Sequence, residues 1–125
     1  MDLLECCGCG GIKADVITYR SAISACEKGG QWQRALDLLA RCQSAGIKAD
    51  VITYNSAISA SEKGGQWQRA LDLLARCQSA GIKADVITYS SAISACEKGG
   101  QWQRALDLLA RCEFAGIKAD VIAYN

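Results

Sequence analysis

The residues of this chain that could carry chemistry are eight cysteines and a few charged and amide side chains that recur at a regular spacing. Cys42, Cys77 and Cys112 lie 35 residues apart, which would place them at equivalent positions of stacked helices. Packed helices are separated by roughly 8–10 Å, whereas the Cα atoms of a disulfide lie within about 7 Å of each other. We therefore expect these thiols to be free, buried as small apolar residues, and suited to a reducing compartment.

The residue types argue against both a metal site and an active site. The chain has no histidine, and only Cys6, Cys7 and Cys9 cluster, without a second cysteine pair at zinc-finger spacing. It also lacks a phosphate-binding Gly-Lys-Ser loop and has no paired carboxylates for acid–base work outside its repeated units. We expect no metal, no cofactor and no catalysis, so the chemistry that remains is binding.

The recurring side chains belong to a unit that repeats every 35 residues. The aromatic residues mark the period: Tyr19, Tyr54, Tyr89 and Tyr124, with Trp32, Trp67 and Trp102. Full units run over 16–50, 51–85 and 86–120. The same register continues into a partial repeat at 1–15, comprising a second helix and linker, and into the start of a further repeat at 121–125. We expect a piece of a longer array.

The three full units are almost the same sequence. The first two differ only at Arg20/Asn55 and Cys26/Ser61, and the third departs from the second at Ser90, Cys96, Glu113 and Phe114. An active site requires an asymmetric arrangement of groups, which near-identical units offer poorly. This regularity strengthens the expectation that the chain is not an enzyme.

Each unit carries the pattern of two helices. The first has an apolar stripe at i, i+3, i+4 and i+7, formed by Tyr19, Ala22, Ile23 and Cys26. Asp15 or Thr18 can cap its start, and Gly29 with Gly30 can end it in a tight turn. The second helix is predicted from about residue 31 to residue 44, with one face formed by Trp32, Ala35, Leu36 and Leu39. Gly46 can then supply a left-handed C-terminal cap.

Neither helix can bury its apolar face within a single hairpin. Stacking the hairpins buries these faces in series, so the sequence predicts an all-α fold, a right-handed α-solenoid of stacked helix-turn-helix hairpins. About three units are the usual minimum for stability, and no polar capping repeat is evident. We expect the isolated chain to be marginally stable, or to aggregate, unless further repeats or a partner cover its ends.

Composition and charge set limits on the partner. Half of the residues are hydrophobic and proline is absent, which excludes a disordered or collagen-like chain. The formal net charge of +1 is low for a protein that holds phosphate backbones by charge alone. No apolar run approaches a membrane span. Met1–Cys9 carries two acidic and no basic residues, which fits neither a secretory signal nor a transit peptide.

The unit as a whole resembles the pentatricopeptide repeat. The resemblance rests on the opening VITYNSAI at 51–58, the turn EKGG at 62–65, and the ending AGIKAD at 80–85, together with the 35-residue period. It extends over essentially the whole chain, and the 34-residue tetratricopeptide period fits less well. The resemblance implies binding of single-stranded RNA in a plastid or mitochondrion, one base per repeat.

The resemblance also implies roles for individual residues. The base-reading pairs would be Arg20 with Asp50, Asn55 with Asp85, and Ser90 with Asp120. Asn with Asp resembles a uracil-preferring pair and Ser with Asp a guanine-type pair, whereas Arg at the first position departs from the usual choices. The base-sandwiching residues would be Ile17, Ile52, Ile87 and Ile122, and the phosphate-facing residues would be Lys28, Lys63 and Lys98.

Each of these roles has a plain structural alternative. The aspartates are good helix N-caps, and capping and base reading can hold together. The isoleucines could belong to the core, and the lysines lie near helix C-termini, where the helix dipole favours a cation. The tryptophans are expected to be packing anchors rather than stacking platforms. Glu27, Asp37 and their equivalents are expected to form solvated faces and local ion pairs.

Two functions follow from this sequence. The first is a non-catalytic module that binds single-stranded RNA in organellar RNA metabolism. The second is a scaffold or accessory subunit of a large organellar protein complex that does not contact RNA, which the near-neutral charge and the unusual Arg20 favour. A contact between either partner and the face that carries Asn55 and Ser90 would distinguish them.

Overall fold

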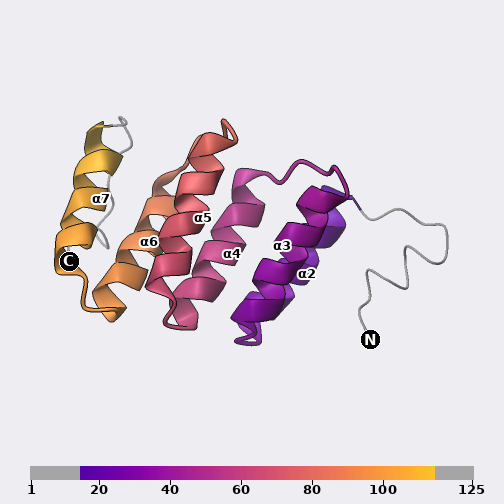
Figure 1. Ribbon diagram of the computed structural model, residues 1–125, viewed down its shortest axis with the longest axis horizontal. Coiled ribbons are helices and arrows are strands. Elements are labelled where there is room, and N and C mark those ends of the chain that lie inside the picture. Colours follow the sequence, from indigo (N-terminus) through magenta and orange to yellow (C-terminus); the bar gives the residue numbers. More distant parts are fainter. Residues whose placement is uncertain (1–14, 115–125) are drawn as a thin grey trace.

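The computed structural model describes residues 15–114, which form six α-helices and no strand. The helices are α2 (Val16–Lys28), α3 (Trp32–Ser44), α4 (Val51–Lys63), α5 (Trp67–Ser79), α6 (Val86–Lys98) and α7 (Trp102–Phe114). They form three consecutive hairpins, each joining a first helix to a second helix through a short turn (Figure 1). The terminal segments, with Cys6, Cys7, Cys9, Asp120 and Ile122, lie outside the described residues.

The hairpins stack side by side in two layers of helices. The first helices α2, α4 and α6 pack in series in one layer, while α3, α5 and α7 lie in the other (Figure 1). Each second helix packs on its own first helix, and α3 and α5 also contact the first helix of the next hairpin. The expected all-α solenoid of stacked helical hairpins is confirmed.

Aspartate side chains define where the first helices begin. Asp15, Asp50 and Asp85 are the N-caps, and each accepts a hydrogen bond from the backbone N–H three residues later, at 2.9–3.0 Å. This bond satisfies one of the N–H groups that a helix leaves free at its start. Of the two caps expected for α2, Asp15 is therefore the correct one, since Thr18 lies inside the helix.

Glycines with positive φ define the two turns of each unit. Gly30, between α2 and α3, has φ of 72°, and Gly46, after α3, has φ of 78°. A side chain with a Cβ rarely adopts this left-handed conformation, so the turns depend on glycine. The second helices α3 and α5 start without a side-chain cap, since Gln31 and Gln66 make no capping hydrogen bond.

The core runs continuously between the two layers. Its largest buried side chains come from both helices of the hairpins and include Ile23, Leu39, Tyr54, Ile58, Leu73, Leu74 and Leu108. The hydroxyl of the buried Tyr54 accepts a hydrogen bond from Gln43 Nε2 at 2.7 Å, so the polar end of the ring has a partner from the preceding hairpin. Burial of the apolar stripe is thus shared between units, as expected for a solenoid.

The tryptophans connect neighbouring hairpins through glycine. A Cβ added at Gly64 would lie 2.3 Å from Cδ1 of Trp32, so the indole of one unit lies directly against the turn of the next. The guanidinium of Arg69 lies over the Trp32 ring, 5.2 Å from its centroid, a favourable cation–π geometry. Trp67 makes the same contacts with Gly99 and Arg104. The expected packing role is confirmed for these two tryptophans.

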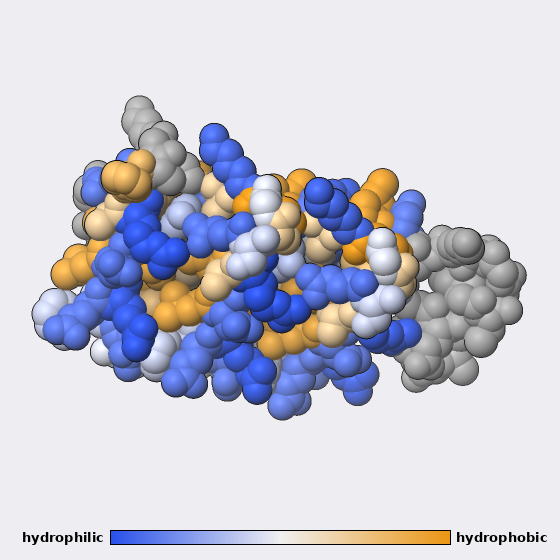
Figure 2. Space-filling view, turned by 45° about the horizontal axis from the view of Figure 1, so that its top comes forward, coloured by the Kyte–Doolittle hydropathy of each residue, from blue (hydrophilic) through white to orange (hydrophobic). Residues whose placement is uncertain are grey.

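Trp102 differs from the other two tryptophans. It is 65% exposed, and exposed Leu106 and Phe114 lie on the same helix. In Figure 2 hydrophobic side chains appear at the α7 end of the molecule and also along the middle of this face, between hydrophilic side chains. The packing role expected for Trp102 is therefore not met within residues 15–114.

The cysteines between residues 15 and 114 are buried, except for the half-buried Cys26. Cys26, Cys42, Cys77 and Cys96 are free thiols, and Cys42, Cys77 and Cys112 are buried, as expected. Burial raises the pKa of the Cys42 and Cys77 thiols, which keeps them protonated and unreactive. None of α2–α7 combines the length and apolar character needed to cross a membrane.

Candidate nucleic-acid interface

The three residues expected to read bases occupy the fifth position of successive first helices. Arg20 lies on α2, Asn55 on α4 and Ser90 on α6. Because these helices pack in series, the three side chains form one row along the stack, with one residue per hairpin. We call this row the reading row.

Asn55 is joined to the start of the next hairpin. Its Nδ2 donates to Asp85 Oδ1 at 3.2 Å, and its Oδ1 accepts from the Thr88 hydroxyl. A carboxylate can only accept and a hydroxyl can donate, so these two partners orient the amide. Asn55 is 8% exposed, and one N–H and one lone pair of its amide have no hydrogen-bond partner among the described residues.

Arg20 is joined in the same way to Asp50. Its Nη1 lies 3.2 Å from Asp50 Oδ2, while Asp50 Oδ1 accepts from the backbone N–H and the hydroxyl of Thr53. The two oxygens of this carboxylate are thus divided between capping α4 and holding the guanidinium. Arg20 has no other hydrogen-bond partner among the described residues.

Ser90 differs from the two preceding residues of the reading row. Its hydroxyl is buried and has no hydrogen-bond partner among the described residues. Asp120, which would complete the third pair, lies outside them. The structure therefore brings together two of the three expected pairs.

Asp50 and Asp85, which are paired with Arg20 and Asn55, have lowered pKa values. Burial alone would raise the pKa of Asp50, but the hydrogen bonds from Thr53 and the charge of Arg20 lower it overall. Burial likewise opposes a lowering of the pKa of Asp85, and the hydrogen bonds from Thr88 and Asn55 prevail. Both carboxylates are ionised at neutral pH, and both cap a helix while holding a side chain of the preceding hairpin.

The isoleucines of the first turns do not belong to the core. Ile17, Ile52 and Ile87 are 56%, 52% and 58% exposed, so the interpretation of these residues as core is wrong. Ile17 precedes the buried Tyr19 by two residues, which is roughly 200° around an α-helix. The isoleucines therefore face away from the buried stripe, and an apolar side chain left in water at every unit is available to a ligand.

The lysines at the ends of the first helices fall into two groups. Lys63 forms an ion pair with Glu27 of the preceding hairpin, and Lys98 forms one with Glu62. These pairs connect neighbouring units, which corrects the expectation of local pairing for the glutamates. Each first helix ends in Glu-Lys, so the two charges were visible in the sequence, but only the structure shows which Glu meets which Lys. Lys28 has no carboxylate partner among the described residues.

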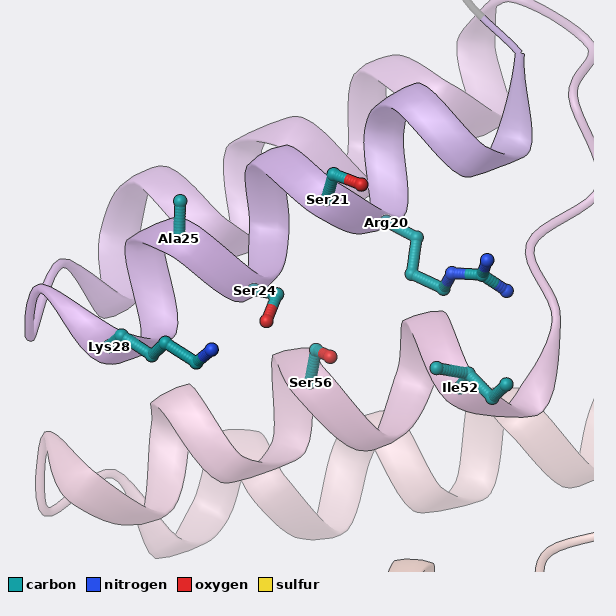
Figure 3. Close-up of a pocket in the computed structure, with 7 residues that line it drawn as sticks. All are labelled: Arg20, Ser21, Ser24, Ala25, Lys28, Ile52 and Ser56. Atoms are coloured by element: carbon teal, nitrogen blue, oxygen red, sulfur yellow. The ribbon is translucent and has the colours of Figure 1, made fainter.

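An open cleft of about 420 Å³ lies between α2 and α4. Figure 3 shows Arg20 and Lys28 extending from α2 toward α4, with Ser24 and Ser56 between them and Ile52 beyond the guanidinium. The cleft therefore combines two cations, hydroxyl groups and an apolar wall. Among residues 15–114 no group of three His, Cys, Asp or Glu side chains is arranged to hold a metal ion.

Sequence comparison identifies the family. The pentatricopeptide repeat domain matches residues 2–63, 37–98 and 72–125, which together span nearly the whole chain. The chain belongs to the pentatricopeptide repeat family. No curated protein sequence matches it significantly.

Solved structures show the same architecture. The chain is similar to the pentatricopeptide repeat protein PPR10 in complex with an 18-nucleotide psaJ RNA element, with 29% identity and a TM-score of 0.84 over 92% of this chain. A cysteine-to-serine variant of PPR10 in the same complex matches equally well. PPR10 from maize, at 22% identity and a TM-score of 0.84 over 96% of this chain, shares the fold. This chain spans 17% of the length of these structures.

Proposed function

We propose that this chain is a non-catalytic module that binds single-stranded RNA along the reading row. The observation that carries the proposal is the repeated pairing of Arg20 with Asp50 and of Asn55 with Asp85, beside an exposed isoleucine in each unit. A polar side chain held in a fixed orientation beside an apolar wall can recognise one base edge per unit. The RNA bound to PPR10, the similar structure, supports this function.

In this arrangement each unit contributes one base site. The exposed isoleucines would flank successive bases, and the residues of the reading row, with Asp50, Asp85 and Asp120, would contact the base edges. We assign uracil to the Asn55 unit and guanine to the Ser90 unit, as the resemblance implies. Of the phosphate-facing lysines, Lys28 is best placed, because the charges of Lys63 and Lys98 are offset by glutamates.

The proposal includes the wider setting of the module. Units at 16–50, 51–85 and 86–120 read about three bases, which is too few for specificity, so the module would act together with further repeats. We place it in the RNA metabolism of a plastid or mitochondrion, as its family membership suggests.

The test measures binding of fluorescent single-stranded RNA to the full chain at several salt concentrations. We expect binding to a uridine-rich strand that weakens steeply with salt. Asn55→Ala should reduce the preference among bases, whereas Gln68→Ala, an exposed position on α5, should leave it unchanged. Absence of salt-dependent binding to any single strand would contradict the proposal.

A scaffold role is the second candidate. The ion-paired state of Lys63 and Lys98 and the exposed Trp102, Leu106 and Phe114 on α7 favour a protein partner over a polyanion. In a pull-down treated with ribonuclease, a partner that is retained by the wild type and lost with Leu106→Asp would support this role. A partner that ribonuclease releases would support RNA binding instead.

A further inference from the structure

The cleft between α2 and α4 has a chemistry that the other units do not repeat, because Arg20 stands where the second unit has Asn55. We infer that this cleft is a guanine-selective nucleotide site, in which the Arg20 guanidinium contacts the O6 and N7 atoms of the base. The inference rests on the proposed RNA-binding function and assigns a base to the unit whose residue departs from the usual pattern.

The guanidinium is fixed before any ligand arrives. Asp50 is anchored by two hydrogen bonds from Thr53, and its second oxygen holds Arg20 Nη1. Arg20 is 30% exposed in its side chain, and Figure 3 shows its guanidinium extended from α2 over the first turn of α4. Arginine has five N–H donors, so most of them remain free for a ligand. A donor group held in one orientation loses little conformational entropy on binding.

The donors of Arg20 select among the four bases. A guanidinium offers N–H groups in a planar fork and cannot accept a hydrogen bond. Guanine presents two neighbouring acceptors, O6 and N7, on one edge, which suit this fork. Adenine places an amino donor beside N7, which opposes a second donor. Cytosine also has two neighbouring acceptors, N3 and O2, on its pairing edge. In uracil an N–H separates the two carbonyl oxygens. Of the two bases with such a pair of acceptors, guanine has the larger ring system and buries more apolar surface against the exposed Ile52. A motif with cytosine at this position would contradict the assignment.

The rest of the cleft suits the remainder of a nucleotide. Ile52 is exposed beside the guanidinium and provides an apolar surface for the face of the base. Lys28 lies eight residues beyond Arg20 on α2, roughly 12 Å along the helix, and no described carboxylate neutralises it. It can therefore contact a backbone phosphate, while Ser24 and Ser56 provide hydroxyl groups between the two cations.

The second unit supplies the internal comparison. There the equivalent residue is Asn55, a neutral amide that both donates and accepts, and the equivalent lysine, Lys63, is paired with Glu27. The backbone geometry is the same in both units, since Asp50 and Asp85 cap α4 and α6 in the same way. A difference in base preference between the two units would therefore come from the side chains.

The experiment uses the substitution Arg20→Asn, which gives the first unit the reading residue of the second. The full chain is incubated with a pool of random single-stranded RNA, and the bound fraction is sequenced. For the wild type we expect guanine both at the motif position of the Ser90 unit and at that of the Arg20 unit, where it is preferred by roughly 5- to 150-fold, the range for a good bidentate contact. In Arg20→Asn the latter position should change to the base enriched at the position of the Asn55 unit, and the other positions should not change.

A modified RNA tests the contact at the level of atoms. Replacing guanine in the selected strand by 7-deazaguanine removes the N7 acceptor. We expect several-fold weaker binding to the wild type and no change in binding to Arg20→Asn. Circular dichroism should show equal helix content, because Asn already occupies the equivalent position in α4.

Two results would overturn the inference while leaving RNA binding in place. One is a motif with no guanine position that responds to Arg20→Asn. The other is a uniform loss of affinity for all sequences with a salt slope lower by about one, which marks a phosphate contact. If no single strand binds in a salt-dependent manner, the proposed function itself fails together with this inference.

Discussion

The first and second hairpins have nearly the same sequence, yet their binding surfaces differ. They differ at only two positions, Arg20/Asn55 and Cys26/Ser61. In the second hairpin Asn55 is 8% exposed and bound by two partners of the next unit, and Lys63 is ion-paired. In the first, Arg20 reaches into an open cleft with Lys28, which has no carboxylate partner between residues 15 and 114. The comparison shows that two near-identical units can present different charged and hydrogen-bonding groups. One cause is the substitution at the reading row, and the other is the presence or absence of a preceding unit that supplies a glutamate partner among the described residues.

The largest expected effect comes from equivalent glycines of these two hairpins. Gly29 and Gly64 both have φ near −85°, so alanine is compatible with either backbone. A Cβ at Gly64 would lie 2.3 Å from Trp32, whereas at Gly29 the nearest atom is a backbone oxygen at 3.4 Å. We expect Gly64→Ala to lower the free energy of unfolding by about 1–3 kcal/mol.

Gly29→Ala is the matched control for that substitution and should change stability by less than about 1 kcal/mol. Urea denaturation followed by circular dichroism measures both variants. Equal destabilisation by the two would show that the contact between Trp32 and the next turn does not hold the hairpins together.

A smaller effect is expected from acidification. The folded pKa values of Asp50 and Asp85 are lowered, as is that of Asp15, where the hydrogen bonds from Thr18 are the main cause. Carboxylates with lowered pKa values contribute stability above the unfolded value of about 3.9, which is lost as the pH falls through the folded pKa. Urea midpoints should therefore be constant near neutral pH and decrease below about pH 4.

The control for the acid transition is Asp50→Asn, which can still cap the helix but cannot titrate in this range. Its urea midpoint should decrease less with acidification than that of the wild type. If the two pH profiles coincide, the cap of the second hairpin does not contribute to the acid transition.

The smallest effect is expected from the lysines. Lys63→Met removes an ion pair with Glu27, and Lys28→Met removes no pair within the described residues. The pair is partly exposed, so we expect Lys63→Met to cost under about 1 kcal/mol at low salt and less at high salt. Lys28→Met should leave stability unchanged while weakening RNA binding. If thermal melts showed a larger loss of stability for Lys28→Met than for Lys63→Met, the inferred difference in lysine pairing between the two hairpins would be contradicted.

Much of the fold could be predicted from the sequence. The apolar spacing of Tyr19 and Ile23, the cap at Asp15 and the glycine at Gly46 locate the helices to within about one residue, because these signals depend on local backbone geometry. The family was also evident, since the openings, turns and endings of the units are specific.

The binding site was less predictable. The resemblance indicated which residues could read bases, but spacing alone did not show that Ile17 is exposed or that Lys63 is neutralised. Both facts depend on how neighbouring hairpins rotate and approach each other. Partners such as Glu27 and Lys63 are separated by a full unit and cannot be assigned from one repeat.

The sequence by itself determined the two helices of each unit and the caps of the first helices, because these follow from the preferences of a few adjacent residues. It also determined the 35-residue period and the stacking of the hairpins, because a repeated apolar face can be buried only against the next unit. Only the tertiary structure decided which hydrogen bonds and ion pairs the residues in and beside the reading row form. It showed that Asp50 divides its oxygens between a helix cap and Arg20, and that Lys28 lies beside an open cleft with no carboxylate partner in the part of the chain that the structure describes. The physical reason is that hydrogen bonds and ion pairs between units depend on distances across the stack. The sequence of a single repeat does not specify these distances.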